Sequence, residues 1–336
     1  GGEIALNYMM RDHGGFEGNG QTLRIVAYLE PFSEKFGMNL VRRSLLGLIK
    51  YPQTLSQLQH SDIAIPPDNL RQLKADDWHP PKGIYDDDKV ILDWVLSPLC
   101  KNDQEIFQAT KAQPKGHHKT LYKSFDCSIM ELADDIAYGI HDLEDAIVTG
   151  VVNQQDFETE VIDKLSQLDD TWLRQYSLTL TTKLFSEQHH LQKDAIGGLV
   201  NYLITAIELT DINLNDPAIN FEEPLLRYNA TLPNTTMQVL QIFKDFVYNF
   251  VIKQTSIQRL EYRGQQIVME LFEALSSDPL RLLPSNSAKR WQHAVDKGEN
   301  SYRVIADYVA GMTDEYAGRL HQTLFVANST GTYHLT

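Results

Sequence analysis

An all-α fold is predicted by two features of the sequence. Apolar residues recur at helical spacing through most of the 336 positions, with turn residues between the periodic segments. The apolar and polar alternation of a half-buried strand is scarce, and SLTLTTKL at 177–184 is the main exception. A chain of this length can bury a substantial core, either as one large helical domain or as two smaller ones.

The first helices are predicted over residues 3 to 10 and 20 to 50, and a Gly-rich turn, DHGGFEGNGQ, separates them. Residues 63 to 120 contain many prolines and short charge clusters, so we expect loops there around one short helix near 88 to 98. A helix is expected over 133 to 146, because this acidic segment lacks proline and continues the apolar pattern before it. Helical periodicity then resumes in six further segments: 156 to 188, 192 to 210, 236 to 253, 255 to 276, 286 to 295 and 301 to 325.

Composition and charge exclude several classes of protein. The formal net charge of -15 is unlike that of a generally basic nucleic-acid-binding surface, so an anionic substrate would need local cations or metal ions. The two cysteines, Cys100 and Cys127, are too few for a disulfide framework and lack zinc-site spacing. No apolar run approaches the length that crosses a bilayer. We therefore expect a cytoplasmic protein with no membrane partner.

The segment ADDIAYGIHDLEDA, residues 133 to 146, is the strongest candidate site. Residues four apart share one face of a helix, so Asp134, Tyr138 and Asp142 would form one row, with Asp145 close to it. A carboxylate in such a row could hold a divalent metal ion, and a tyrosine with a second acid could hydrogen-bond hydroxyl groups of a ligand. A solvated acidic face is the alternative interpretation, since charge runs on helices are common.

Two shorter motifs could contact phosphate. FEGNGQTLR at 16–24 enters a helix from a Gly-rich turn and could present backbone N–H groups, although a plain connection between helices is the simpler interpretation. Lys50 in GLIKYP could reach a phosphate, or could complement the dipole at the end of its helix. The common NTP-binding loop pattern is absent from the sequence.

Three other clusters are interpreted without a ligand. The pairs His117–His118 and His189–His190 have no helical or cysteine partner for a metal, so we interpret them as polar loop residues. The segment ADYVAGMTDEYAGRL at 306–320 is interpreted as helix packing with close approach at Gly311. No signature of covalent catalysis is present in the sequence.

Four motifs resemble, in the same order, those of the bacterial deoxyguanosinetriphosphate triphosphohydrolase family of HD-domain phosphohydrolases: HGGFEGNGQTLR, GLIKYP, DCSIMELADDIAYGIHDLEDA and DYVAGMTDEYAGRL. The resemblance extends from residue 1 to about residue 325. It implies an all-helical HD-domain bundle, with 1–150 as the C-terminal portion of the HD-type domain and 151–336 as a helical HD-associated domain. It also implies a metal-dependent enzyme that cleaves a deoxynucleoside triphosphate, dGTP above all, into the deoxynucleoside and tripolyphosphate.

The resemblance gives the acidic row specific roles. Asp134 matches a metal ligand, and Tyr138 and Asp142 match residues that contact the sugar and its 3'-hydroxyl. The implied metal is Mn or Mg, with Fe, Co, Ni and Zn as further candidates. The family's other three metal ligands, a His and a His-Asp pair, precede the position that Gly1 matches. Because the sequence does not begin with Met, we expect it to be a truncated part of a longer enzyme. The alternative is a fragment that is inactive by itself.

Residues elsewhere in the chain also acquire roles through the resemblance. Asn19 and Lys50 match residues that hold the triphosphate, and Glu3 matches an acid that, together with a histidine, assists the attacking water. Arg259 or Arg263 could add positive charge near the phosphates, on the basis of charge and helical location alone.

The expected partners are deoxynucleoside triphosphates and further copies of the chain in a homo-oligomer, with nucleic acid only as a secondary ligand. Two other interpretations remain open at this point. One is a non-catalytic nucleotide-binding or regulatory protein that keeps the acidic row without the metal. The other is a structural helical protein with an acidic surface.

Overall fold

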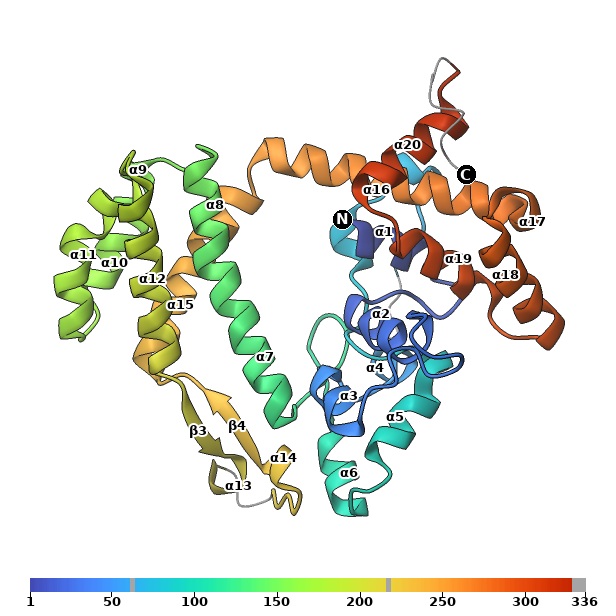
Figure 1. Ribbon diagram of the computed structural model, residues 1–336, viewed down its shortest axis with the longest axis horizontal. Coiled ribbons are helices and arrows are strands. Elements are labelled where there is room, and N and C mark those ends of the chain that lie inside the picture. Colours follow the sequence, from blue (N-terminus) through green and yellow to red (C-terminus); the bar gives the residue numbers. More distant parts are fainter. Residues whose placement is uncertain (61–63, 216–218, 328–336) are drawn as a thin grey trace. The chain divides into compact units, whose positions relative to one another are not determined.

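The computed structural model describes residues 1–60, 64–215 and 219–327. Helices dominate these residues, and the strands among them form two short antiparallel pairs, which confirms the predicted all-α class (Figure 1). The chain forms two compact units, the first made of residues 1–123 and 259–336 and the second of residues 124–258. None of the described helices has the length and apolarity needed to cross a bilayer.

The predicted division at residue 150 falls within the second unit. The first unit is discontinuous in sequence, so a single boundary along the chain cannot separate the two units. The assignment of 1–150 and 151–336 to an HD-type and an HD-associated domain stays a prediction, and residues 61–63, 216–218 and 328–336 lie outside the described residues.

Short helices build the first unit. Its amino-terminal part contains α1 (Gly2–Met9), α2 (Gly18–Arg24), the π-helical turn η1 (Ile25–Leu29), α3 (Arg42–Leu48), α4 (Leu55–Leu58), the 3-10 turns η2 (Leu70–Gln72), η3 (Ala75–Trp78) and η4 (Asp86–Asp88), α5 (Lys89–Leu96), α6 (Lys101–Phe107), and the strands β1 (Thr110–Lys111) and β2 (Lys119–Thr120). Its carboxy-terminal part contains α17 (Pro279–Leu282), α18 (Ser285–Lys297), α19 (Ser301–Ala310) and α20 (Asp314–Phe325). The helix α16 (Thr255–Ser277) begins in the second unit and continues into the first.

The core of the first unit joins its two chain segments. Leu6 and Met10, in and just after α1, pack in one cluster with Phe272 of α16 and Ile305 of α19. Burying such side chains removes apolar surface from water, at about 1.5–3 kcal/mol for each one that is fully buried. The carboxy-terminal segment therefore supplies one wall of the core around α1.

The helix predicted over 20 to 50 is interrupted in the structure. The turn η1 ends at Leu29, before Pro31, and α3 begins only at Arg42. Proline lacks a backbone N–H, and Gly37 and Asn39 have φ angles of 52° and 53°, in the left-handed region that a helix cannot include. In the segment predicted as loops, α5 occupies the expected place of the short helix, and α6 is an additional helix.

The second unit contains long helices and short helical segments. They are α7 (Phe125–Ile136), the π-helical turn η5 (Ala137–His141), α8 (Asp142–Val148), α9 (Gln154–Phe157), the π-helical turn η6 (Glu158–Ile162), α10 (Asp163–Ser166), α11 (Thr171–Leu184), α12 (His189–Thr205), α13 (Ile212–Asn215), α14 (Pro224–Arg227), α15 (Asn234–Val247) and the π-helical turn η7 (Tyr248–Ile252). The strands β3 (Glu208–Asp211) and β4 (Tyr228–Thr231) pair in antiparallel fashion, with Glu208 opposite Thr231.

The strand-like segment SLTLTTKL lies within α11. Leu173, Leu180 and Leu184 of this helix are buried together with Ser177, at spacings of three, four and seven that place them on one helical face. The predicted helix over 192 to 210 ends at Thr205, and β3 follows three residues later. The segment SLTLTTKL therefore forms a helix because its buried side chains follow a helical period and not an alternating one.

The acidic segment belongs to one long helical rod formed by α7, η5 and α8, drawn in green in Figure 1. Ser124 caps the start of the rod, because its hydroxyl accepts a hydrogen bond from the Cys127 N–H. Ile136, Ile140 and Leu143 are buried in the core of the second unit, in one cluster with residues of α15. Burial of this apolar face leaves the carboxylates of Asp134 and Asp142 exposed, while Tyr138 between them packs partly against the core.

Candidate functional site

Asp134, Tyr138 and Asp142 lie along the rod, on either side of and within its π-helical turn. The Asp142 N–H donates to the carbonyl of Ala137, five residues earlier, whereas an α-helix uses a carbonyl four residues earlier. At about 100° per residue, an uninterrupted α-helix would rotate Asp142 about 80° past Asp134 after two turns. The wider turn rotates less per residue and brings the two acids back toward one line, so the predicted row is present.

Close packing on α15 fixes the orientation of the rod. Gly139 lies at this contact, and a Cβ atom there would lie 3.0 Å from Leu240 Cδ1, 3.4 Å from Lys244 Cγ and 3.6 Å from Phe243 Cβ. Lys244 also pairs with Asp135, with Nζ and Oδ1 2.7 Å apart. The glycine and this ion pair hold one side of the rod on the core, and the neighbouring Asp134 is exposed.

The acids of the row interact electrostatically. The pKa of Asp142 is raised by partial burial and by the negative charges of Asp145 and Asp134. The pKa of Tyr138 is raised by partial burial and by the charge of Asp142. A bound cation would relieve this repulsion, and hydroxyl groups of a ligand could donate to the carboxylates.

The first unit contains a second polar cluster, around Glu3 of α1. Lys82 Nζ lies 2.9 Å from Glu3 Oε1 and 3.3 Å from Glu17 Oε1. The Gly18 N–H donates to Glu3 Oε1 at 2.8 Å, and the Asn19 side-chain amide donates to Glu17 Oε1 at 2.7 Å. The structure therefore joins Glu3 and the FEGN motif around one lysine.

A buried ion-pair network extends from the FEGN motif to the last predicted helical segment. Gln21 donates to Asp307 Oδ1 at 3.1 Å, and Arg24 bonds the same carboxylate through Nε at 2.8 Å. Arg24 also pairs with Asp88 at 2.7 Å, and Arg290 pairs with Asp307 at 3.1 Å. The segment 306–320 thus contributes a buried acid.

The close approach predicted at Gly311 is not at another element. A Cβ atom there would meet carbonyl oxygens of its own helix α19, those of Asp307 at 3.3 Å and Tyr308 at 3.7 Å. Gly311 directly follows the helix as its C-terminal cap residue. The glycine ends α19, and Asp307 makes polar tertiary contacts. Ala306 and Val309 are buried in the core of the first unit, as the interpretation of this motif as helix packing expects.

The remaining predicted cations are Lys50, Arg259 and Arg263. Lys50 follows the end of α3, is half-buried, and its Nζ lies 5.9 Å from the centre of the Tyr51 ring. Arg259 and Arg263 are exposed on α16, and Arg263 lines a cavity of about 290 Å³ with Glu270 and His321. Neither the position of Lys50 nor that of the two arginines tests their expected contact with phosphate.

The predicted site residues fall into two sets. Glu3, Asn19 and Lys50 belong to the first unit, where Glu3 and Asn19 share the cluster around Lys82. Asp134, Tyr138 and Asp142 belong to the second unit and share one row. The catalytic, substrate-binding and metal-binding roles of these six residues stay predictions.

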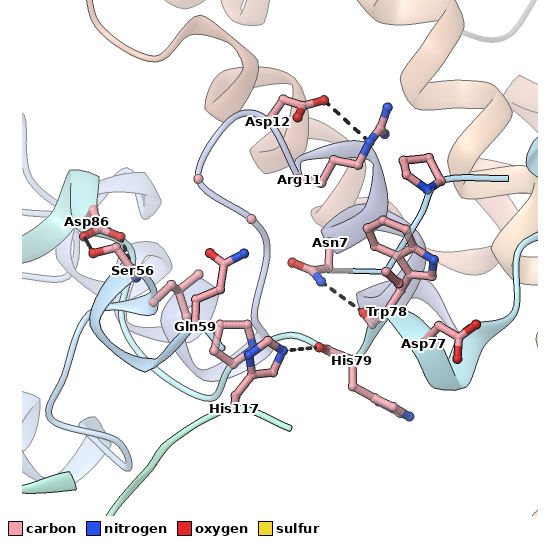
Figure 2. A pocket seen from close by; sticks show the side chains of 16 residues that line it. Asn7, Arg11, Asp12, Ser56, Gln59, Asp77, Trp78, His79, Asp86 and His117 are labelled. Carbon is pink, nitrogen blue, oxygen red and sulfur yellow. Dashed lines mark hydrogen bonds and ion pairs between the residues drawn. The ribbon is translucent and has the colours of Figure 1, made fainter. Parts of the chain in front are cut away.

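A cavity of about 360 Å³ in the first unit includes none of these six residues (Figure 2). Figure 2 shows the His117 ring pointing to the carbonyl of His79, at 3.0 Å, and its other ring nitrogen accepts from the His60 N–H at 3.0 Å. Burial lowers the pKa of His117. His117 therefore ties two other loops together, a structural role that the interpretation as a polar loop residue missed, and His189 begins α12 and is not in a loop.

The expected divalent metal has one suitable ligand in the acidic row. Carboxylate oxygens are ligands for Mn and Mg, and Asp134 is an exposed carboxylate beside further acids. Within the described ranges, no group of three or more His, Cys, Asp and Glu side chains could hold a metal ion. The described residues therefore fit one ligand of such a site.

Sequence patterns missed the roles of Lys82 and Glu17, and Asp307 was noted only within a segment interpreted as helix packing. Glu17 was noted only as part of FEGNGQTLR, whose glycines suggested that backbone N–H groups could bind phosphate. Lys82 is in a loop 79 positions after Glu3, and Asp307 follows Arg24 by 283 positions. No local periodicity connects residues so far apart.

Comparisons with known proteins agree on one family. A family model described as a phosphohydrolase-associated domain matches residues 230–323. Similar proteins named deoxyguanosinetriphosphate triphosphohydrolase-like protein occur in Shewanella woodyi, at 56% identity over 97% of this chain and 72% of the relative, and in Shewanella pealeana, at 57% over 98% and 73%. One from Aliivibrio fischeri is 54% identical over 97% of this chain and 73% of its own length.

Identity at this level extends over nearly all of the chain, and the four motifs that suggested the family lie inside the matched length. The row on the rod and the cluster around Glu3 supply the residue types that phosphohydrolase chemistry uses. The chain belongs to the deoxyguanosinetriphosphate triphosphohydrolase-like family of HD-domain phosphohydrolases.

Proposed function

We propose that the protein is a metal-dependent triphosphohydrolase that cleaves a deoxynucleoside triphosphate, dGTP above all, into the deoxynucleoside and tripolyphosphate. The observation that carries this proposal is the row of Asp134, Tyr138 and Asp142 along the rod, in which both carboxylates are exposed and the tyrosine is half-buried against the core. The names of the relatives support a nucleoside triphosphate as substrate.

Asp134, Tyr138 and Asp142 would supply a metal ligand and sugar contacts. HD-domain phosphohydrolases generally use divalent metal ions, and Asp134 would be one ligand of Mn or Mg. Such an ion, when bound, supplies Lewis-acid activation of the phosphate and of a water molecule. Tyr138 and Asp142 would bind the sugar, with the Asp142 carboxylate accepting a hydrogen bond from the 3'-hydroxyl.

Glu3, Lys50 and Asn19 would supply an acid and phosphate contacts. Glu3 would accept a hydrogen bond that orients the attacking water, directly or through a histidine. Lys50 would neutralise part of the charge that develops on the leaving tripolyphosphate. Asn19 has two amide hydrogens, of which one is used for Glu17, and the other would bind a phosphate oxygen.

The test is tripolyphosphate release by the full-length protein from each of the four dNTPs, with Mn, with Mg and with a chelator. We expect metal-dependent release, fastest from dGTP. We expect Asp134→Ala to reduce kcat at least a hundredfold and to weaken metal binding. Because Asp134 is exposed, its replacement should change the free energy of unfolding by no more than about 0.5 kcal/mol.

Asp163→Ala is the matched control, since Asp163 is an exposed acid of the same unit at the start of α10. Its kcat and its metal affinity should equal those of the parent protein. Binding of dNTPs without any turnover by the parent would contradict the proposal and favour a regulatory nucleotide-binding protein. Parental turnover and metal content in Asp134→Ala would refute the role of that residue.

Assembly and location are part of the same proposal. We expect a cytoplasmic homo-oligomer that binds nucleic acid only as a secondary ligand. Neither Cys100 nor Cys127 forms a disulfide, which fits a reducing compartment. Light scattering of the full-length protein at several concentrations would measure the number of subunits.

A further inference from the structure

Lys82 lies between two carboxylates of unequal burial. The Glu17 side chain is fully buried, and the Glu3 side chain is 32% exposed. Lys82 Nζ is 2.9 Å and 3.2 Å from the two oxygens of Glu3 and 3.3 Å from Glu17 Oε1. We propose that Lys82 is a positioning residue, which holds the Glu3 carboxylate in place for hydrolysis; this inference rests on the function proposed above.

Glu17 has a structural role that requires a positive charge nearby. It caps α2 by accepting the Gly20 N–H at 2.8 Å, and it accepts the Asn19 amide at 2.7 Å. A fully buried carboxylate without a counter-charge would be strongly destabilising, and Lys82 is the cation beside it. The position of the ammonium group is therefore set by the buried partner.

Glu3 is held by this same ammonium group and by one backbone donor. Its Oε1 accepts both Lys82 Nζ and the Gly18 N–H, whereas its Oε2 contacts Lys82 at the longer distance of 3.2 Å. Each carboxylate oxygen has two lone-pair directions. The arrangement fixes the carboxylate plane through Oε1 and leaves acceptor capacity on Oε2 for the water or its histidine.

The lysine is anchored and charged. The residues after it form a bridge between Ile84 and Thr54, and the Ile84 N–H donates to the Gln53 carbonyl at 2.9 Å. Burial alone would lower the pKa of Lys82, but its hydrogen bond to Glu3 and the charge of Glu17 outweigh that effect and raise it. Lys82 therefore carries its charge at neutral pH.

The experiment compares kcat and KM for dGTP in the full-length protein and in Lys82→Met, Lys82→Arg and Lys89→Met. Loss of a group that orients a general base should reduce kcat of Lys82→Met by about ten- to a hundredfold, with KM within threefold of the parent value. Lys82→Arg should restore most of kcat, because guanidinium can bond both carboxylates. Lys89, an exposed partner of Asp93 outside the cluster, should be replaceable with parental kcat.

A double variant, Lys82→Met with Glu17→Gln, separates positioning from folding. It removes the uncompensated buried charge, and glutamine can still cap α2 through its amide oxygen. We expect thermal stability to recover in the double variant while kcat stays low, because Glu3 still lacks its cation. Recovery of kcat together with stability would show that Lys82 is only structural and would overturn the inference.

The proposed function and this inference fail in different ways. Absence of turnover in the parent protein would overturn the proposed function and the inference with it. Turnover in the parent together with parental kcat in Lys82→Met would overturn the inference alone.

Discussion

Asp88 combines burial with incomplete hydrogen bonding. Its side chain is 2% exposed, and Oδ1 pairs with Arg24 at 2.7 Å. Within the part of the chain that the structure describes, Oδ2 is buried without a hydrogen-bond partner. Burial raises the pKa of Asp88 from 3.8 to about 6, although the charge of Arg24 opposes the shift. The folded chain therefore retains this proton to a higher pH than the unfolded chain does.

The sign of the resulting pH dependence follows from proton binding. Between about pH 4 and pH 6 the folded state binds more protons at Asp88 than the unfolded state does, so its contribution to stability falls as pH rises through this window. A shift from 3.8 to about 6 corresponds to about 3 kcal/mol over the whole window.

Asp88→Asn should remove this dependence, because the amide does not titrate. We expect the free energy of unfolding of the parent, measured relative to the variant, to fall by up to about 3 kcal/mol from pH 4 to pH 7. Urea unfolding at several pH values measures this difference. Asp93→Asn, at an exposed acid, is the control. A constant difference between parent and Asp88→Asn across the window would contradict the burial argument.

The π-helical turn η5 has two structural roles. It places the acidic row on one side of the rod, and it brings Gly139 against α15 on the other. Leu240, the nearest neighbour of Gly139, is 4% exposed and belongs to the core, so it has little room to move.

Gly139→Ala should therefore destabilise the protein by about 1–2 kcal/mol, because overpacking outweighs the gain in helix propensity. Gly197→Ala is the matched control, since Gly197 lies in α12 of the same unit and a Cβ atom there would meet nothing within 4 Å. That control should stabilise by about 0.5–1 kcal/mol. Thermal unfolding of both variants tests the packing, and equal shifts in the two would refute it.

Helices whose apolar residues recur at one clear spacing were predictable from the sequence, but the breaks and π turns within them were not. The helix over 133 to 146 is present, but its π turn left no mark that alternation or spacing could reveal. Pro31 and Gly37 do mark the break in the segment 20 to 50, yet its leucines at helical spacing dominated the prediction. In α11, the sequence SLTLTTKL fits both the alternation of a strand and the period of a helix. Which of the two forms depends on which leucines are buried, and the sequence does not show this.

Sequence spacing also decides which part of the site could be predicted. Asp134, Tyr138 and Asp142 are four residues apart, so the row follows from helix geometry. The contact of Lys82 with Glu3 depends on the path of the chain between them, which propensities do not determine. The resemblance supplied roles for Glu3 and Asn19 but not the lysine that joins them.

At the scale of the whole molecule, one unit is continuous along the sequence and the other is not. The second unit is one uninterrupted segment, and the described residues of its core cluster all lie within that segment, from Leu132 to Ile252. In the first unit, Leu6 and Met10 need Phe272 and Ile305 from the far end of the chain.

Residues 124–258 expressed alone should therefore fold. We expect a helical circular-dichroism spectrum and cooperative thermal unfolding, as for a small domain with its own core. Residues 1–123 expressed alone should lack a cooperative transition, because part of their core is missing. Gradual melting of the segment 124–258 would show that its core is insufficient by itself.

During synthesis on the ribosome, the discontinuity of the first unit delays the completion of its core. Residues 1–123 emerge first, but the partners of Leu6 and Met10 emerge only after the second unit has been made. At about 5–20 residues per second, the intervening segment takes roughly 7–27 s to translate. During that interval the second unit can fold as it emerges, while the apolar side of α1 stays open to a chaperone or to a neighbouring nascent chain.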